Sequence, residues 1–317
     1  MEQVIRLFPV ALREDLRDCG IFGQGLEEIR IRVNEYLMFH TSSGERFLKG
    51  KTLTERPQEG CVRMGSGEIG QMCTFMSRYS LYAYEDEIRQ GFLTVEGGHR
   101  VGVCGQVLAG EGRIERISPI SYLNIRIAGE RKGCGVPVFP CLHQEGDFLD
   151  TLILSPPGVG KTTLLRDLIR LLSDGTGGVP GKKVGLVDER SEVAGCIRGI
   201  PQRDVGLRTD VLDGCPKAEG MMLLVRSMSP QILAVDEIGG EEDLRALKAA
   251  VRCGCRILAT VHCGSLEELW KKPGWEECRR LQIFSRFVVL GRQGSARRFR
   301  VFTAEGTAVP AEGKEKR

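Results

Sequence analysis

Lys161 and Thr162 stand where the pattern of the chain changes. An apolar run, Leu152-Ile153-Leu154, ends at the proline- and glycine-rich segment SPPGVG, and leucines at helical spacing follow. This order predicts a buried strand, a tight loop and a helix. In such a loop the backbone N–H groups and the positive end of the helix converge on one point, which favours a polyphosphate. Lys161 would reach its outer phosphates, and the Thr162 hydroxyl would ligate Mg²⁺.

The spacing matches the phosphate-loop pattern G-x-x-x-x-G-K-[ST] except at its first position, which is Ser155. The glycine usually found there serves a tight turn and makes no side-chain contact, so a small serine followed by two prolines can hold the same path. A nucleotide polyphosphate with Mg²⁺ is therefore the predicted ligand. The residues predicted to bind the nucleotide are Ser155, Pro156, Pro157, Gly158, Val159, Gly160, Lys161, Thr162 and Thr163.

Three later apolar segments each end in polar residues. They are 183–187, followed by Asp188 and Glu189; 231–235, followed by Asp236 and Glu237; and 256–261, followed by His262. The carboxyl ends of parallel strands meet at one edge of a sheet, where ligands of such sheets bind. The sequence therefore predicts that these side chains converge on the phosphate loop.

Each of these polar residues has a predicted role. Asp236 would hold the metal together with Thr162, and Glu237 would polarise the attacking water. Glu189 is the second candidate for the base, although a charged surface turn is the alternative for its segment. His262 would sense the terminal phosphate, with a packing role as the alternative.

The segment 192–217 is rich in glycine and proline and carries several arginines, so we expect it to be irregular. Arg198, Arg203 and Arg208 are candidates for stabilising transition-state charge, in cis or across a subunit boundary. A solvated basic loop is the alternative.

Composition limits the class of protein. The 317 residues suffice for two domains, and 41% apolar with 27% charged residues is typical of a globular protein. No apolar run approaches the ~18 residues of a membrane span, so we expect a cytoplasmic protein whose membrane association is peripheral. Twelve cysteines without zinc spacing predict reduced thiols, and a net charge of +3 does not indicate stable nucleic-acid binding.

The chain divides at a glycine-rich charged segment, 129–135. We expect a smaller α+β domain over 1–132, with a long helical segment over 66–88, and an α/β domain with a mainly parallel sheet over 133–305. Residues 306–317 are charged and lack periodicity, which predicts a disordered tail.

Several runs together closely resemble one family. SPPGVGKTTLLRDLIR, VDERSEVAG, PQRDVGLRTDVLD, SPQILAVDEIGG and ATVHCGS resemble the stage III sporulation protein AA family, within the type II/IV secretion ATPases of the RecA-like P-loop group. LEEIRIRV and GFLTVEGGHRVGVCG extend the resemblance over nearly the whole chain. It implies a RecA-like P-loop ATPase domain, with Asp188 and Glu189 in the acidic box, Glu237 as the Walker B carboxylate and His262 in the histidine box.

Two departures separate the chain from the broader secretion ATPases. Those ATPases have glycine where Ser155 stands, and the second departure follows the Walker B strand. Their Walker B strand typically ends Gly-Glu-Ile-Arg-Asp, whereas this one ends in the run DEIGG, residues 236–240. The change adds a metal-binding aspartate and removes an Arg-Asp pair, so the subunit contacts of that pair are not transferred to this chain.

The resemblance implies Mg²⁺-dependent ATP hydrolysis by a cytoplasmic ring-forming motor, commonly a homo-hexamer. The motor would energise a sporulation-specific secretion or feeding channel between mother cell and forespore, through the membrane proteins of that channel. Two alternatives remain open: a nucleic-acid-dependent ATPase of RecA type, and a nucleotide-gated scaffold without useful hydrolysis. The intact Glu237 argues against the scaffold.

Overall fold

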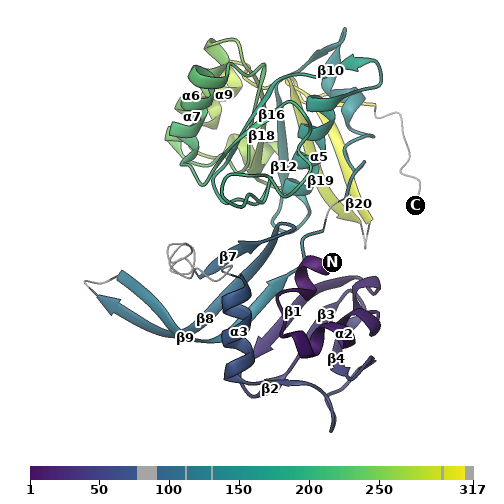
Figure 1. Cartoon of the computed structure of the whole chain (residues 1–317). Coiled ribbons are helices and arrows are strands. Elements are labelled where there is room, and N and C mark those ends of the chain that lie inside the picture. The colour runs from purple at the N-terminus through teal and green to yellow at the C-terminus, as the bar shows by residue number, and fades with distance from the viewer. Residues whose placement is uncertain (77–90, 111–112, 130, 294–295, 311–317) are drawn as a thin grey trace. The chain divides into compact units, whose positions relative to one another are not determined.

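The computed structural model describes residues 1–76, 91–110, 113–129, 131–293 and 296–310. The chain forms two compact units, Met1–Gly129 and Glu130–Arg317. Figure 1 shows the elements of each unit.

The first unit is α+β. Pro9 separates its first two helices and is the N-cap of the second, since proline lacks the N–H that a helix interior needs. Its described helices are α1 (Glu2–Ile5), α2 (Val10–Asp18), the 3-10 helix η1 (Ile21–Gly23) and α3 (Ser66–Met76). The remainder of the predicted helix 66–88 lies outside the described residues.

The described strands of the first unit include an antiparallel sheet of seven, in the order β5-β4-β3-β1-β9-β8-β7. In β1, Ile29 and Ile31 are buried whereas Arg30 between them is exposed, as the alternation in the sequence predicts. The strands of this unit are β1 (Leu26–Arg32), β2 (Glu35–Tyr36), β3 (Met38–Thr41), β4 (Gly44–Lys49), β5 (Thr52–Thr54), β6 (Arg63–Met64), β7 (Phe92–Val95), β8 (His99–Gly110) and β9 (Arg113–Arg126).

The second unit is built on a sheet of eight described strands, in the order β16-β15-β17-β18-β12-β19-β20-β21. The first six run parallel, and β20 and β21 are added antiparallel. These strands are β12 (Thr151–Ser155), β15 (Val184–Asp188), β16 (Thr209–Asp213), β17 (Ile232–Val235), β18 (Arg256–His262), β19 (Arg286–Gln293), β20 (Ala296–Thr303) and β21 (Ala308–Val309). The mainly parallel sheet confirms the predicted α/β class.

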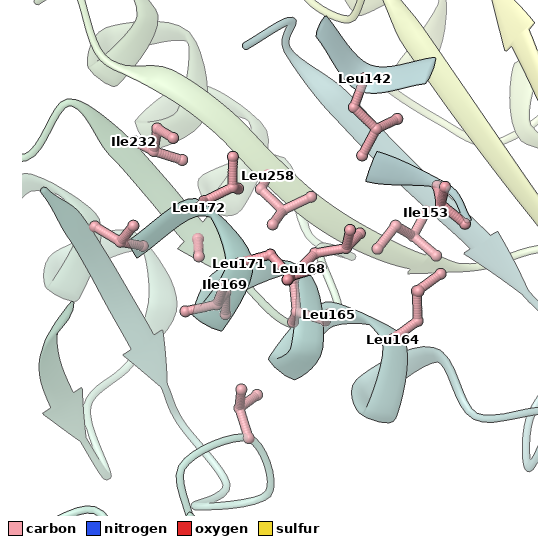
Figure 2. Close-up of a cluster of buried hydrophobic side chains, with 14 of the residues drawn as sticks. Leu142, Ile153, Leu164, Leu165, Leu168, Ile169, Leu171, Leu172, Ile232 and Leu258 are labelled. Carbon is pink, nitrogen blue, oxygen red and sulfur yellow. The ribbon is translucent and has the colours of Figure 1, made fainter. Parts of the chain in front are cut away.

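Helices cover both faces of this sheet. Helix α5 packs on one face, and Figure 2 shows its leucines beside Ile153 and Leu258 of the sheet. The opposite face, with Leu152 and Leu154, packs against α6, α7, α8 and α9. The helices are η3 (Phe139–Leu142), α5 (Lys161–Asp174), α6 (Lys217–Met228), α7 (Glu241–Arg252), α8 (Leu266–Trp270) and α9 (Trp275–Arg280). Two short hairpins pair β10 (His143–Gln144) with β11 (Asp147–Phe148), and β13 (Gly175–Thr176) with β14 (Val179–Pro180).

Two segments differ from the expectation. Part of the irregular segment 192–217 forms strand β16, the edge of the sheet, which pairs with β15 alone. Beyond residue 305, β21 pairs with β20, so the sheet extends into the predicted tail; residues 311–317 lie outside the described chain. Among the described helices, none has the length and apolar character needed to cross a membrane.

Candidate phosphate-binding site

The loop between β12 and α5 has the backbone of a phosphate cradle. Gly158 and Gly160 adopt φ angles of 74° and 108°, in the left-handed region that favours glycine. Ser155 is fully buried, and its hydroxyl donates a hydrogen bond of 2.8 Å to the Pro156 carbonyl. The serine hydroxyl at the first position therefore has its hydrogen-bond partner within the loop. The small side chain does not obstruct the curved path of the backbone.

Lys161 begins α5 and is only 4% exposed. Its Nζ donates to Glu237 Oε1 at 2.8 Å and lies 3.4 Å from Asp236 Oδ1. A buried ammonium needs such partners, because an unpaired charge in a low-dielectric environment is costly. The carboxylates that follow β17 thus lie directly beside the loop, as the sequence predicted.

Asp236 also accepts hydrogen bonds from two hydroxyls. Thr162 Oγ1 donates to Asp236 Oδ2 at 2.8 Å, and Thr260 Oγ1 donates to Asp236 Oδ1. The structure therefore brings together Thr162 and Asp236, the two residues predicted to hold Mg²⁺. Hydroxyl and carboxylate oxygens are the ligands that this hard cation prefers, so the donor set fits it.

Glu237 lies at the centre of the site. Its Oε1 also contacts His262 Nε2 at 2.7 Å, and its Oε2 contacts Arg190 Nη1 at 3.1 Å. Burial acts to raise the pKa of Glu237, but the hydrogen bond and charge of Lys161, together with His262, outweigh it and hold the pKa below its ordinary value. The carboxylate is therefore ionised at neutral pH.

The backbone of Glu237 is strained. Its φ angle is 59°, in the left-handed region that costs about 1–3 kcal/mol for a residue other than glycine. The Glu237 N–H donates to Thr260 Oγ1 at 2.9 Å, and the Ile238 N–H donates to the Thr260 carbonyl at 2.8 Å. These two hydrogen bonds from β18 hold the turn that directs Glu237 at Lys161.

Asp188 and Glu189 have other partners. Asp188 is buried and accepts the backbone N–H groups of Glu192, Val193 and Ala194 at 2.8 to 3.0 Å. Burial raises its pKa above the ordinary value, even though these three hydrogen bonds act to lower it. Glu189 forms an ion pair with Lys217 at the start of α6. Asp188 thus contacts the backbone that follows it, and Glu189 contacts α6. A catalytic role for Glu189 stays a prediction.

The three predicted arginines are not gathered at the loop. Arg208 donates to the Ser173 carbonyl at 2.9 Å, near the end of α5, roughly 18 Å from Lys161 at ~1.5 Å per residue. Arg198 is exposed with a φ of 52°, and Arg203 is half-buried, its N–H donating to the Ala194 carbonyl at 3.1 Å. Action across a subunit boundary stays a prediction for all three.

Other residues at the site were given no role by the sequence reasoning. The sequence shows Arg190 and Thr260 as polar residues near strand ends, but it does not indicate that they contact Glu237. Arg292, on β19, donates from Nη2 to the Gly158 carbonyl at 2.9 Å. Arg297, on β20, has its guanidinium against Gly160. The sequence signal for this pair is the basic segment 292–300.

A comparison with known families shows to which family the chain belongs. The family model described as Sporulation stage III, protein AA, matches residues 1–309. The chain belongs to this family. Stage III sporulation protein AA of Bacillus subtilis (strain 168) is 44% identical over 272 residues, which cover 84% of this chain and 83% of that protein. The resemblance predicted from the motifs is confirmed.

The chain is also similar to a protein of Porphyra purpurea. The uncharacterized protein ycf45 of Porphyra purpurea is 30% identical over 183 residues, 56% of this chain and 30% of that protein.

Solved structures establish the fold. The Legionella pneumophila ATPase DotB matches with a TM-score of 0.58 at 15% identity, over 94% of this chain and 82% of its own. The pilus retraction motor PilT, solved with bound ADP, matches with a TM-score of 0.59 at 13% identity, over 89% of this chain and 79% of its own. The predicted RecA-like P-loop fold of the secretion ATPases is confirmed.

Proposed function

We propose that this chain binds ATP with Mg²⁺ and hydrolyses the terminal phosphate bond. One observation carries the proposal: Lys161 and Thr162 at the start of α5 contact Asp236 and Glu237 at the end of β17. Membership of a sporulation family with the fold of secretion ATPases supports an ATPase-like role for the same chain.

Each residue has a chemical task under this proposal. Lys161 would exchange its carboxylate partners for phosphate oxygens, which suits a flexible ammonium on a long side chain. Thr162 and Asp236 would hold Mg²⁺, which offsets phosphate charge when bound. Glu237 is ionised at neutral pH and can accept a proton from the attacking water, and His262 orients its carboxylate.

We further propose a motor role in the mother cell of a sporulating bacterium. The chain would act as a homo-oligomeric ring, with six subunits expected, and would associate peripherally with membrane proteins of a secretion or feeding channel. PilT, which has the same fold, is described as a pilus retraction motor, and this supports a mechanical use of ATP here.

A turnover assay on the purified full chain tests the enzymatic proposal. We expect Mg²⁺-dependent phosphate release by the wild type and none by Lys161→Ala. Glu237→Gln should retain ATP binding but lose turnover by roughly 10²-fold or more, the scale of a general base. Glu242→Gln, at an exposed position of α7, is the matched control and should behave as the wild type.

Two outcomes would contradict the assignment. Wild-type turnover in Lys161→Ala would place the nucleotide elsewhere, and equal rates in Glu237→Gln and wild type would move the base role to Glu189. Turnover stimulated by DNA or RNA with a steep salt dependence would favour a nucleic-acid-dependent ATPase over a secretion motor. Sizing with and without a slowly hydrolysed ATP analogue tests the ring.

A further inference from the structure

Two arginines of the β19–β20 hairpin reach the phosphate loop. Arg292 and Arg297 are direct partners in the antiparallel ladder, so both side chains leave the same face of the hairpin. Arg292 donates to the Gly158 carbonyl at 2.9 Å. A Cβ atom placed on Gly160 would lie 2.6 Å from Arg297 Cζ. The guanidinium therefore fills the space that a side chain at position 160 would need.

The charges in this arrangement require an explanation. Like charges directly opposite each other in a ladder are destabilising. The loop nearby adds the positive start of α5 and its backbone N–H groups. Among the described contacts, the Arg292 guanidinium donates to a neutral acceptor, the Gly158 carbonyl. A polyanion in the loop would offset this concentration of positive charge.

The order of the strands places the arginines opposite the carboxylates. Strand β12, which leads into the loop, lies between β18 and β19. Next to β12 on one side, β18 carries His262, the partner of Glu237; on the other side, β19 and β20 carry Arg292 and Arg297. The two groups thus approach the loop from different sides.

We propose that Arg297 binds, in cis, the inner phosphates of the nucleotide, which lie farther from Glu237 than the terminal phosphate does. Arg292 would stabilise the loop through its hydrogen bond to the Gly158 carbonyl. The inference rests on the proposed binding of ATP. Guanidinium is suited to this task because it is always charged and presents paired N–H donors that match phosphate oxygens. Since the contact is with the inner phosphates, it should serve ADP as well as ATP.

Equilibrium binding of ATP and ADP to the full chain, in competition with a fluorescent nucleotide, tests the inference. Arg297→Ala should weaken both nucleotides by about 10-fold or more, the scale of a charge-assisted hydrogen bond. Arg297→Lys should recover part of the loss, and Arg292→Ala should lose less than Arg297→Ala. The matched control is Arg298→Ala, because Arg298 is exposed, lies on the same strand and points to the other face.

The possible results separate the inference from the proposed function. If the wild type binds, Lys161→Ala does not, and Arg297→Ala binds as the wild type does, only the arginine assignment is wrong. A loss for ATP alone, or an equal loss in Arg298→Ala, would also overturn it. If the wild type bound neither nucleotide, the proposed function and the inference would fail together. Thermal unfolding without nucleotide, with Arg297→Gln as a second variant, identifies any loss caused by misfolding.

Discussion

Thr260 Oγ1 donates a hydrogen bond to Asp236 Oδ1, and the same hydroxyl accepts the N–H of the next residue, Glu237, at 2.9 Å. Thr260 is fully buried in β18, whereas the two acidic residues follow β17. The Thr260 side chain therefore fixes both the side chain of Asp236 and the backbone of Glu237.

Replacing Thr260 by valine should damage turnover more than ATP binding. Valine keeps the shape of threonine but leaves the half-buried Glu237 N–H without its acceptor, which costs about 1 kcal/mol or more. We expect urea unfolding to report a loss of this size and phosphate release to fall. Thr260→Ser keeps the hydroxyl and should restore both. Unchanged turnover in the valine variant would show that the hydroxyl does not position Glu237.

The ion pairs of Glu237 should make a pH-dependent contribution to the stability of the nucleotide-free protein. Because its pKa in the folded state lies below the ordinary value of 4.5, folding favours the ionised carboxylate. This contribution is fully present above about pH 4.5 and is lost as the pH falls through the lowered pKa.

Urea unfolding of wild type and Glu237→Gln, from pH 7 through pH 4.5 and on into the acidic range where the folded protein takes up the proton, measures this contribution. The difference in free energy of unfolding should stay constant near neutral pH and shrink in the acidic range. A difference that instead grew on acidification would contradict the lowered pKa. The Glu242→Gln variant, which removes an exposed carboxylate of α7, is measured in parallel as the control.

Asp188 should prove to be a structural residue. Asn at this position keeps one acceptor oxygen, but its NH₂ group would face backbone donors that now bind Oδ2. Each buried donor left unsatisfied costs about 1–3 kcal/mol, so Asp188→Asn should lower the free energy of unfolding by at least that amount. The affinity of the folded fraction for ATP should not change.

Asp210→Asn, on the neighbouring strand β16, is the matched control for Asp188→Asn and should have little effect on stability. A stably folded Asp188→Asn protein without ATP turnover would instead assign Asp188 a direct part in the chemistry.

Gly160→Ala should weaken nucleotide binding at least as much as Arg297→Ala does, for a steric reason. Its new Cβ would displace the Arg297 guanidinium and would also strain a backbone with a φ of 108°. Gly254→Ala is the matched control, because Gly254 has a φ of 86° with open space around it. The control should lose about 1–2 kcal/mol of stability from backbone strain but bind ATP normally. Normal ATP binding by Gly160→Ala would contradict the close packing of loop and arginine.

Local patterns predicted the part of the site that depends on local structure. The strand, loop and helix around Lys161 could be predicted from apolar spacing and glycines. Two of the three polar strand ends converge on the loop, as the rule for parallel sheets predicts. The carboxylates of the third strand end do not, because Asp188 binds three nearby N–H groups and the sequence carries no signal for that turn. Arg190, which follows them, does contact Glu237.

The features that the sequence did not predict depend on long-range pairing. Strand β16 is an edge strand with only two apolar residues, Val211 and Leu212, so its segment resembles a loop. The approach of Arg292 to Gly158 requires β19 to lie beside β12, which is more than 130 residues earlier in the chain. No local periodicity specifies such a neighbour.

The position of β12 between β18 and β19 has a consequence for how ligands arrive. One flank of the loop carries Asp236 and Glu237, which are paired with Lys161, and the other flank carries Arg292 and Arg297. When Lys161 turns to the phosphates, the two carboxylates face the terminal phosphate with one positive partner fewer. A divalent cation that arrives with the nucleotide offsets this repulsion between like charges. We therefore expect the magnesium complex of the nucleotide, and not the free anion, to enter productively.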